Sequence, residues 1–551
     1  MAFLPSHITL VGIASGVLMH LAVFRRGEWD VASPSVFLCY FTVAAAGTLA
    51  SHLHFHVETP LIAIFFFFHA VGIFTSMLVY RAFFHRLSAF PGPFLARLSN
   101  FYITARSMKK LQLFAETEKL HAQYGDYVRV GPRELSIADP EAVKAIYGSQ
   151  SPCTKGPWYT LLEPRVPLFM ARDKQEHARR RKVWDQAFTT KAIAAYDVRI
   201  TGFINRLLSV IDRHQGQPLD VAQWFAYFVF DVIEDLGFSQ SPNMLEDGKE
   251  AYIFKTIRAD MFNIALFTHL PWLLPFLKRT PLLNRNYLEF WDWIANKVDK
   301  RAKNKPAQPD IFGPLLAAYH ASPQSLRDRY DLHADAQLIV IAGSDSVAAA
   351  LTHIFFHLAW DPSLASRLQR ELDALPDLSH DRHLAAVPLL DAVINETLRL
   401  HPPVPSGTQR ETPPGGLWIG RHGGGGEGGG EGKGGVYIPG ETIVQVPSHT
   451  VFRDERAFAR AGEFVPERWT TRPEMVRMRE AFVPFNTGPY ACIGKRLAML
   501  QMRRVVAEIL ARYDVAVAPG QTKEGFLGGK QDTFTTVSAP LPLVFTRRVR
   551  A

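Results

Sequence analysis

Three long apolar stretches open the chain, and almost no charged residue interrupts them. They are Ile8–Phe24, Val36–Leu53 and Leu61–Tyr80. Each is close to the roughly 17–25 residues that a helix needs to cross the hydrocarbon layer of a membrane. A cleaved signal peptide is the alternative for the first stretch, but no basic segment precedes it. We therefore expect residues 1–84 to be a membrane anchor with up to three transmembrane helices.

The basic residues beside these stretches predict their orientation. Arg25 and Arg26 follow the first stretch, and Arg81 and Arg86 follow the third, whereas residues 51–59 contain no Lys or Arg. Cytosolic loops carry an excess of basic residues. We expect three crossings, with the N-terminus in the lumen and both the first loop and the remaining chain in the cytosol.

After residue 93 the hydrophobic pattern becomes that of a water-soluble domain. Apolar residues recur at three- and four-residue spacing in long segments, which predicts helices, and shorter segments have the composition of strands. The predicted helices are His333–Trp360, Leu389–His401 and Lys495–Tyr513, and the predicted strands are Tyr127–Val130, Leu417–Ile419, Val436–Ile438 and Thr442–Val446. We expect one large domain over residues 85–551, mostly α with small β-sheets.

Two proline- or glycine-rich segments interrupt these patterns. Helix cannot pass through Phe90-Pro91-Gly92-Pro93, because proline lacks an N–H donor and fixes its backbone. We expect a stiff hinge there, and an ordinary loop is the alternative. Residues 423–435 contain ten glycines. Their single lysine is not followed by Ser or Thr, which disfavours a phosphate-binding loop and favours a flexible insert between two strands.

Composition supports this division of the chain. The first 84 residues contain six Asp, Glu, Lys or Arg, and the other 467 contain 107. A hydrophobic content of 47% excludes a disordered chain, and three cysteines exclude a disulfide-stabilised scaffold.

Cys492 is the most distinctive candidate for chemistry. Neither it nor Cys153, which we expect to be a packed side chain, has a partner at the spacing of a zinc site. Cys492 follows a Gly- and Pro-rich turn and precedes a predicted helix. A thiol at a helix N-terminus beside Lys495 and Arg496 is biased towards the thiolate, which a nucleophile or a soft metal ligand requires. A cysteine hydrolase, which would need a nearby histidine base, remains an alternative at this point.

Four motifs occur in an order that resembles the cytochrome P-450 family. The segment Phe485-x-x-Gly488-x-x-x-Cys492-x-Gly494 is similar to the heme-binding loop of these enzymes. The other three motifs are Glu396-Thr397-Leu398-Arg399, Pro466-Glu467-Arg468-Trp469 and Ala342-Gly343-Ser344-Asp345-Ser346. The resemblance covers roughly residues 90–545. The anchor is typical of membrane-bound microsomal members, and the Gly-Pro-Tyr sequence and glycine insert resemble members from filamentous fungi.

The resemblance implies the cytochrome P-450 fold and a heme b cofactor, with Cys492 as the axial thiolate of the iron. This ligand favours cleavage of the dioxygen bond. Phe485 would pack against the edge of the heme. Glu396, Arg399 and Arg468 would form a buried structural triad that locks the cysteine loop. A surface ion pair, worth well under 1 kcal/mol, is the alternative for Glu396 and Arg399.

The resemblance also implies a catalytic acid–alcohol pair. Asp345 and Ser346 would lie over the heme and guide protons for dioxygen activation, and Gly343 would relax the helix to make room. Ser346 stands where the family more often has Thr, and it lacks the methyl group that helps to fix the rotamer of the hydroxyl. We expect oxygen activation to be retained with altered efficiency.

Cations are expected around the heme propionates. His177 and Arg181 lie four residues apart on a basic helix, and Arg410 matches a heme-contacting arginine of the family. A solvated basic face is the alternative for residues 177–182. Tyr490 departs from the family, which usually has Arg or His there, so one propionate contact would be weaker or supplied elsewhere.

Electrons are expected from a separate protein, because no Gly-x-Gly-x-x-Gly opens a helix after a strand. The resemblance implies an NADPH-dependent cytochrome P-450 reductase and attachment to the endoplasmic reticulum membrane. It gives no indication of nucleic-acid binding. Four basic residues would give the docking face its charge, with ordinary helix solvation as the alternative. They are Lys495, Arg496, Arg503 and Arg504.

The expected reaction is insertion of one oxygen atom from dioxygen into an apolar small molecule, as a step in secondary metabolite biosynthesis. We expect Trp158–Phe169, the start of the Gly343 helix and Val404–Thr408 to line the pocket. Two alternatives remain. One is a heme-thiolate isomerase or dehydratase without a reductase, which the Asp345-Ser346 pair disfavours. The other is a membrane heme-binding protein without turnover.

Overall fold

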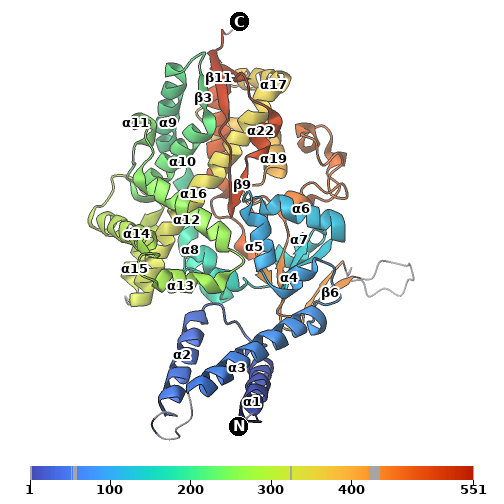
Figure 1. The fold of residues 1–551 in the computed structure, drawn as a ribbon. Helices are drawn as coiled ribbons and strands as arrows, with labels where there is room; N and C mark the ends of the chain where they lie inside the picture. Colours follow the sequence, from blue (N-terminus) through green and yellow to red (C-terminus); the bar gives the residue numbers. More distant parts are fainter. Residues whose placement is uncertain (1–2, 51–52, 54–58, 323–324, 421–434, 550–551) are drawn as a thin grey trace.

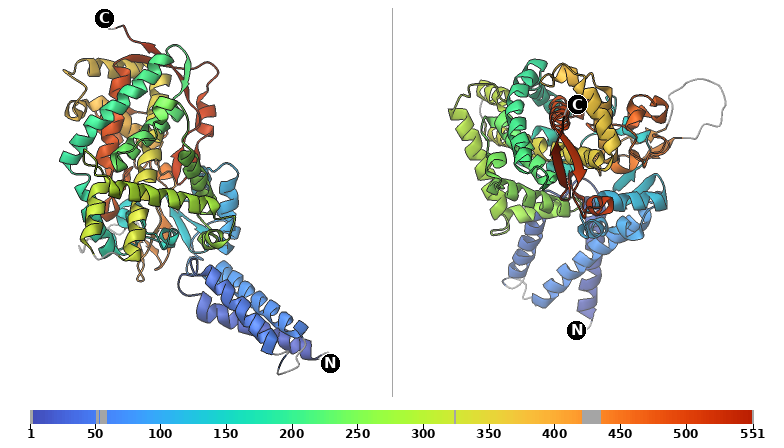
Figure 2. Two further views of the ribbon diagram at one scale, coloured as in Figure 1. Left: turned by 90° about the vertical axis from the view of Figure 1, so that its left-hand side faces the viewer. Right: turned by 90° about the horizontal axis from the view of Figure 1, so that it is seen from above.

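Three N-terminal helices project together from one end of a larger, mostly helical body (Figures 1 and 2). The computed structural model describes residues 3–50, 53, 59–322, 325–420 and 435–549. The projecting helices are α1 (Phe3–Met19), which continues into the turn η1 (His20–Phe24), α2 (Ser33–Ala50), and α3 (Thr59–Val79), which continues into η3 (Tyr80–Phe84). They coincide with the predicted apolar stretches, and all three are long and apolar enough to cross a membrane.

The projecting helices pack closely through small residues. A Cβ atom on Gly16 of α1 would lie 2.1 Å from the carbonyl oxygen of His69, and one on Gly72 of α3 would lie 2.3 Å from that of Ile13. His69 also joins all three helices, because its ring nitrogens lie 2.8 Å from Ser15 Oγ and 3.3 Å from Tyr40 Oη. Small residues at the contact and a few interhelical hydrogen bonds are typical of helices that associate in lipid.

The body is built from helices, as its hydrophobic periodicity predicts. The helices are α4 (Phe94–Leu98), α5 (Phe101–Met108), α6 (Leu113–Tyr124), α7 (Ala142–Tyr147), α8 (Lys174–Gln186), α9 (Thr190–Arg213), α10 (Val221–Phe238), α11 (Met244–Asp247), α12 (Tyr252–Phe267), α13 (Leu274–Arg279), α14 (Arg285–Lys303), α15 (Phe312–Ala321), α16 (Leu326–Trp360), α17 (Pro362–Asp373), α18 (Asp381–Leu384), α19 (Pro388–Leu400), α20 (Ser448–Val451), α21 (Lys495–Leu510) and α22 (Lys523–Gly528).

Four small sheets complete the body. A four-stranded sheet has the order β1-β2-β7-β4, a three-stranded sheet has the order β3-β11-β8, and β5-β6 and β9-β10 are hairpins. The strands are β1 (Tyr127–Gly131), β2 (Glu134–Ile137), β3 (Pro218–Asp220), β4 (Arg410–Glu411), β5 (Leu417–Ile419), β6 (Val436–Ile438), β7 (Ile443–Gln445), β8 (Tyr513–Val517), β9 (Gln531–Thr533), β10 (Thr535–Val537) and β11 (Pro542–Arg547). The predicted fold class is therefore confirmed.

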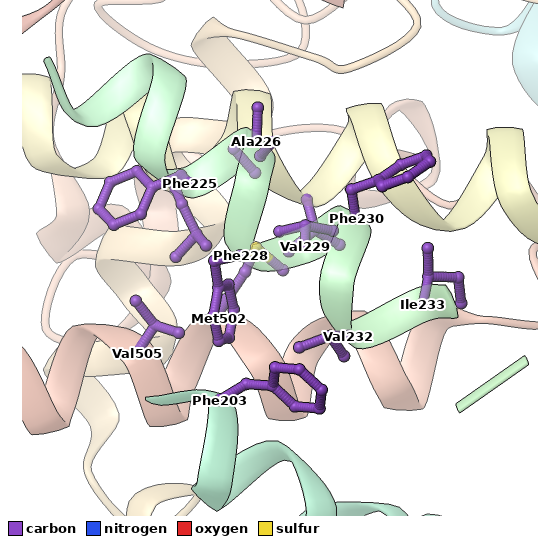
Figure 3. Packing of buried hydrophobic residues seen from close by; sticks show 14 of the residues in the cluster. Phe203, Phe225, Ala226, Phe228, Val229, Phe230, Val232, Ile233, Met502 and Val505 are labelled. Carbon is purple, nitrogen blue, oxygen red and sulfur yellow. The ribbon is translucent and has the colours of Figure 1, made fainter. Parts of the chain in front are cut away.

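Helix α10 lies at the centre of the hydrophobic core. Its side chains are apolar around most of its circumference, so it is buried against α9, α16 and α21. Figure 3 shows Phe228 and Val232 of α10 gathered with Phe203 of α9 and with Met502 and Val505 of α21. This core fixes α21, the helix that begins just after Cys492, against the middle of the body.

Helix α16 is also long and apolar enough to cross a membrane, but 67% of its apolar window is buried inside the body. It is therefore a core helix. It starts at Leu326, ahead of the predicted start at His333, because Ser325 and Asp328 form a capping box at its N-terminus. The predicted helix Lys495–Tyr513 is too long, because α21 ends at Leu510 and Tyr513 opens strand β8.

The segment between the projecting helices and the body is fixed in place. The carbonyl oxygen of Pro91 accepts a hydrogen bond of 2.8 Å from the backbone N–H of Arg129 in β1. Gly92 has φ +152°, and a Cβ atom there would lie 2.4 Å from the carbonyl oxygen of Arg129. The guanidinium of Arg129 in turn donates to the carbonyl of Arg81 at 3.1 Å. The proline-rich segment is thus a stiff connection held against β1.

Strands β5 and β6 flank the glycine-rich insert and pair antiparallel, Ile419 with Val436 and Leu417 with Ile438. The insert itself lies outside the described residues except for Gly435.

Deleting residues 423–434 shortens the connection between Ile419 and Val436 from sixteen residues to four. Each halving of a loop changes its closure free energy by only about 0.6 kcal/mol. We expect thermal unfolding to show equal or slightly higher stability, with cofactor uptake unchanged. Loss of folded protein or of cofactor uptake would contradict this prediction.

Candidate active site

A cavity of about 690 Å³ lies inside the body, and the Cys492 loop forms part of its wall. Two of the predicted lining segments contribute to it, through residues such as Trp158 and Val404. The Gly343 helix lines it from Gln337 onward, with the middle of α16 and not with its start at Leu326. A large part of the wall comes from segments that the sequence reasoning missed: α12 to α14 and the turn between β9 and β10. Their lining residues include Ile257, Met261, Ile264, Phe267, Leu274, Tyr287, Phe290 and Phe534. These segments carry ordinary helical periodicity and no motif, so the sequence gives no sign of their role.

The Cys492 side chain is exposed, and the space that it faces is this cavity. Its loop is closed by a hydrogen bond of 2.8 Å from the backbone N–H of Cys492 to the carbonyl oxygen of Phe485. Gly488 has φ +67°, and a Cβ atom there would lie 2.6 Å from the carbonyl oxygen of Tyr147. Glycine is therefore required where the loop approaches α7. Phe485 lines the cavity together with Cys492.

In the protein alone, burial raises the pKa of the Cys492 thiol, although backbone N–H groups of Gly494 and Lys495 and the charge of Arg181 act in the opposite direction. The predicted bias towards thiolate is therefore not supplied by the helix N-terminus itself. A metal ion on the sulfur reverses this balance, since a coordinated thiol is deprotonated. The groups that act on the Cys492 thiol within the described residues are the backbone of Gly494 and Lys495 and the charges of Arg181 and Lys495, with no histidine base among them.

One side of the cavity carries a cluster of cations around Tyr490. Lys155 Nζ lies 4.5 Å and the Arg410 guanidinium carbon 4.9 Å from the centre of the Tyr490 ring. His177 stacks edge-on against the same ring at 4.7 Å between ring centres. Arg181 lines the cavity too, and its Nη1 donates to the carbonyl oxygen of Ala491 at 2.7 Å. The four predicted propionate contacts therefore lie together, along with Lys155, which the sequence reasoning did not single out.

In the described part of the chain Arg181 pairs with Asp185 at 2.9 Å, whereas Lys155, His177 and Arg410 have no ion-pair partner. Among the described residues that line the cavity there is no Asp or Glu. Burial and neighbouring cations, Arg410 foremost, lower the pKa of Lys155 to about 6. Burial, followed by the charge of Lys155, lowers the pKa of His177 to about 3. The Tyr490 hydroxyl is buried without a hydrogen-bond partner in the described part of the chain. A dianionic group would balance the charge of Lys155 and Arg410 and accept a hydrogen bond from the Tyr490 hydroxyl, so the residues present fit the two propionates of a heme.

Helix α16 brings Ser346, but not Asp345, to the cavity wall. Ser346 Oγ donates to the carbonyl oxygen of Ala342 at 3.3 Å. The Asp345 carboxylate instead accepts a hydrogen bond of 3.4 Å from Thr535 Oγ1, and Thr535 does line the cavity. Burial raises the pKa of Asp345.

Gly343 does not act as predicted. Helix α16 is continuous from Leu326 to Trp360, so the helix is not relaxed at Gly343. A Cβ atom on Gly343 would lie 2.3 Å from Cγ1 of Ile233 in α10. The glycine therefore lets these two core helices approach closely, beside the cavity that both residues line.

The predicted triad is assembled around the Glu396 carboxylate. Its Oε1 accepts from Arg399 Nη2 at 2.8 Å and from Arg468 Nε at 2.9 Å, and all three side chains are fully buried. Two further donors complete the shell, Trp469 Nε1 at 2.9 Å and the backbone N–H of Val465 at 2.8 Å. Trp469 belongs to the Pro466–Trp469 motif, and only the structure shows that its indole N–H donates to Glu396.

The triad reaches the cysteine loop through the long segment that precedes it. Arg399 donates to the carbonyl oxygens of Phe452, Ala461 and Glu463 at 2.6 to 2.8 Å. Beyond this, the Trp469 ring lies 4.5 Å from the ring of Phe482, which directly precedes the loop. The effect of the triad on Cys492 is therefore indirect and passes through residues 452–482.

Two of the four basic residues predicted for the docking face are exposed, and the other two are not available to a partner. Lys495 and Arg496 are exposed at the start of α21. Arg504, however, is completely buried and pairs with Asp197 and Thr201. Arg503 pairs with Asp391 and Asp381 at 2.7 and 3.2 Å. These two arginines hold α21 in the fold because they point inward on its helical face, so the prediction that they give charge to a docking surface is wrong.

The triad gives a test of stability. We expect Glu396→Gln to lower the free energy of unfolding by about 3–5 kcal/mol, because it removes the charge that two buried guanidiniums require. Thermal and denaturant unfolding of the full-length protein in detergent would measure this. Arg460→Gln is the matched control, since it breaks an exposed ion pair with Glu463 in the same segment. The control should leave the unfolding curve unchanged, and equal curves for the two variants would contradict the prediction.

Comparison with known proteins agrees with this geometry. A family model for cytochrome P-450 matches residues 91–417 and 431–544, and the gap between the two matched parts falls at β5 and the glycine-rich insert. A cytochrome P-450 monooxygenase (orf5) of Eupenicillium brefeldianum is 50% identical over 481 residues, which cover 87% of this chain and 95% of that relative. The monooxygenase FCK2 of Fusarium pseudograminearum is 42% identical, over 99% of this chain and 98% of that relative.

A tryprostatin B 6-hydroxylase of Neosartorya fischeri is 32% identical, over 87% of this chain and 86% of that relative. The family match spans most of the chain, and two of these relatives are aligned over nearly their whole length. The chain therefore belongs to the cytochrome P-450 family and is a heme-thiolate monooxygenase.

Proposed function

We propose that this enzyme inserts one oxygen atom from dioxygen into an apolar small molecule of fungal secondary metabolism. The observation that carries the proposal is one large cavity that has a free thiol on its wall, several basic side chains beside the thiol, and no carboxylate among the described lining residues. The relatives named tryprostatin B 6-hydroxylase support hydroxylation as the reaction. They also favour a monooxygenase over an isomerase, a dehydratase or a protein without turnover.

The lining of the cavity identifies the residues that would hold the heme. Cys492 Sγ would be the axial ligand of the iron, and Phe485 would pack against the ring. Lys155 and Arg410 would neutralise the propionates, and the unpaired Tyr490 hydroxyl would donate one hydrogen bond to them. His177 and Arg181 line the same side of the cavity. When bound, heme supplies the iron at which dioxygen is activated for transfer of one oxygen atom to the substrate.

Two hydroxyl groups would bring protons to the cavity. Ser346 Oγ is held on α16 by its bond to the carbonyl of Ala342 and faces the cavity. Asp345 contacts the cavity only through Thr535 Oγ1, and its raised pKa favours the protonated acid relative to an exposed aspartate. We propose that Asp345 supplies protons through Thr535 and that Ser346 positions the proton donor at the reacting side.

The substrate is proposed to be a neutral, apolar molecule with planar parts. Trp158 and Phe534 stack with 12° between their planes at 5.1 Å, and Phe169 lies edge-on to Phe534 at 5.7 Å. All three rings line the cavity. Such aromatic surfaces bind flat apolar groups through dispersion and quadrupole interactions.

The enzyme requires a redox partner, which we propose is an NADPH-dependent cytochrome P-450 reductase. Lys495 and Arg496 lie exposed at the helix that follows Cys492 and suit an acidic partner surface. We further propose that residues 1–84 anchor the protein in the endoplasmic reticulum membrane, with the catalytic domain in the cytosol. Contacts between the loop after α1 and the body support this topology, because both must then lie on the same side of the membrane.

The identity of the axial ligand is tested by substitution. We expect Cys492→Ala to abolish the reduced carbon-monoxide absorption band that is typical of thiolate-bound heme, because no other thiolate faces the cavity among the described residues. Cys153→Ala is the control, since Cys153 is buried away from the cavity, and it should keep the band. A Cys492→Ala protein with the band intact would overturn the assignment.

The role of Ser346 is tested by the yield of product per NADPH in a membrane reconstituted with reductase. A positioned proton donor typically contributes about 100-fold or more, and Ser346→Ala keeps the donor but removes the hydroxyl that positions it, so we expect the yield to fall by part of this factor, about tenfold. Ser344→Ala is the matched control, because Ser344 is a buried neighbour on α16 that does not line the cavity. An unchanged yield in Ser346→Ala would remove Ser346 from the proposal.

A further inference from the structure

The loop that joins η1 to α2 is folded against the catalytic body. Glu28 in this loop forms a bidentate ion pair with Arg172, with Oε2 2.7 Å from Nη1 and Oε1 2.8 Å from Nη2. Ser33 at the start of α2 donates from Oγ to the carbonyl oxygen of Trp272 at 2.6 Å, and Phe37 of α2 packs edge-on against Phe276 of α13. The N-terminal segment thus contacts the body at more than one point.

Arg172 is itself part of the structure around the cation cluster. Its Nε donates to the carbonyl oxygen of Lys155 at 3.0 Å, and its Nη2 also donates to Glu411 Oε2 at 3.2 Å. The backbone joins the same two segments, because Thr154, the residue before Lys155, exchanges hydrogen bonds of 3.0 and 2.9 Å with the backbone of Glu411. Arg172 therefore clamps the segment that carries Lys155 to strand β4, which carries Arg410.

We propose that Glu28 is a positioning residue for the cofactor, and that the loop between the first two N-terminal helices is an integral part of the propionate-binding side of the cavity. Glu28 fixes the guanidinium of Arg172, Arg172 fixes the backbone of Lys155 and strand β4, and these place the two buried cations. The inference rests on the proposed function, because it assigns the cations to heme propionates.

The geometry explains why one carboxylate has this effect. The Glu28 carboxylate accepts one hydrogen bond from each terminal nitrogen of Arg172. In this orientation the Nε–H of Arg172 points at the carbonyl oxygen of Lys155. Without Glu28, the Arg172 guanidinium keeps Glu411 as its ion-pair partner among the described residues and can turn towards it, which releases the Lys155 carbonyl. Although burial favours the protonated acid, the hydrogen bonds and charge of Arg172 leave the pKa of Glu28 lowered. The pair is therefore ionised at neutral pH.

The test measures how fast heme leaves the full-length protein in lipid nanodiscs, with excess apomyoglobin as the hemin acceptor. A bidentate, partly exposed pair of this kind predicts about 3- to 10-fold faster hemin release in Glu28→Gln. Arg172→Gln should show a similar effect, and the double variant should be no faster than the faster single variant, because both act through one contact. Glu28→Asp, which keeps the charge, should release hemin more slowly than Glu28→Gln.

A matched control is the ion pair Arg86–Glu441, which also joins the segment after the projecting helices to the body, at 3.1 Å. Among the described residues Arg86 bonds to Glu441 and not to Lys155, Arg172 or Glu411, so Arg86→Gln should release hemin at the wild-type rate. A wild-type rate in Glu28→Gln, or strictly additive effects in the double variant, would overturn the inference while the wild type still holds heme. A wild-type protein that takes up no hemin would contradict the proposed function itself.

Discussion

A carboxylate buried as completely as that of Glu396 is stable only when charge and hydrogen bonds surround it, and this requirement organises the cysteine side of the protein. Arg399 and Arg468 supply the charge, and each also donates to backbone carbonyls in the irregular segment before the cysteine loop. That segment has little regular secondary structure of its own. Its path is set by the side chains of two arginines, and the position of Cys492 depends on that path.

A second constraint on the Cys492 loop is the positive charge of the cavity that it borders. The cavity beside Cys492 concentrates positive charge without an acidic partner among the described lining residues. Buried cations without anions are unfavourable, as the lowered pKa of Lys155 indicates. Cofactor binding would therefore contribute to the stability of the folded state itself, since a ligand that binds only the folded protein stabilises it. The triad holds the loop whether or not heme is present, whereas the cation cluster needs the anion.

The sequence was sufficient where a local pattern carries the chemistry. The apolar stretches, the Cys492 loop, the Glu396–Arg399 pair at helical spacing and the basic helix with His177 and Arg181 all lie where the periodicity and motifs predict. The sequence was insufficient where the role of a side chain depends on whether its face of the helix is turned towards the core or towards solvent. Arg503 and Arg504 look like surface charge in the sequence, but the core position of α21 turns them inward. Lys155, Glu28 and Arg172 carry no motif at all, and only the fold brings these distant residues to one place.

The charge of the cavity also bears on which molecules can enter it. With Lys155 and Arg410 facing the propionates of a bound heme, a protonated amine would still meet Lys278 on the wall and no carboxylate among the described lining residues. An amine with a pKa of about 9 must lose its proton to bind, which costs about 2.7 kcal/mol at pH 7. Amides, N-acylated compounds and other neutral nitrogen heterocycles incur no such cost. A cavity wall without a carboxylate would thus favour, among nitrogen-containing molecules, those whose nitrogen is not basic.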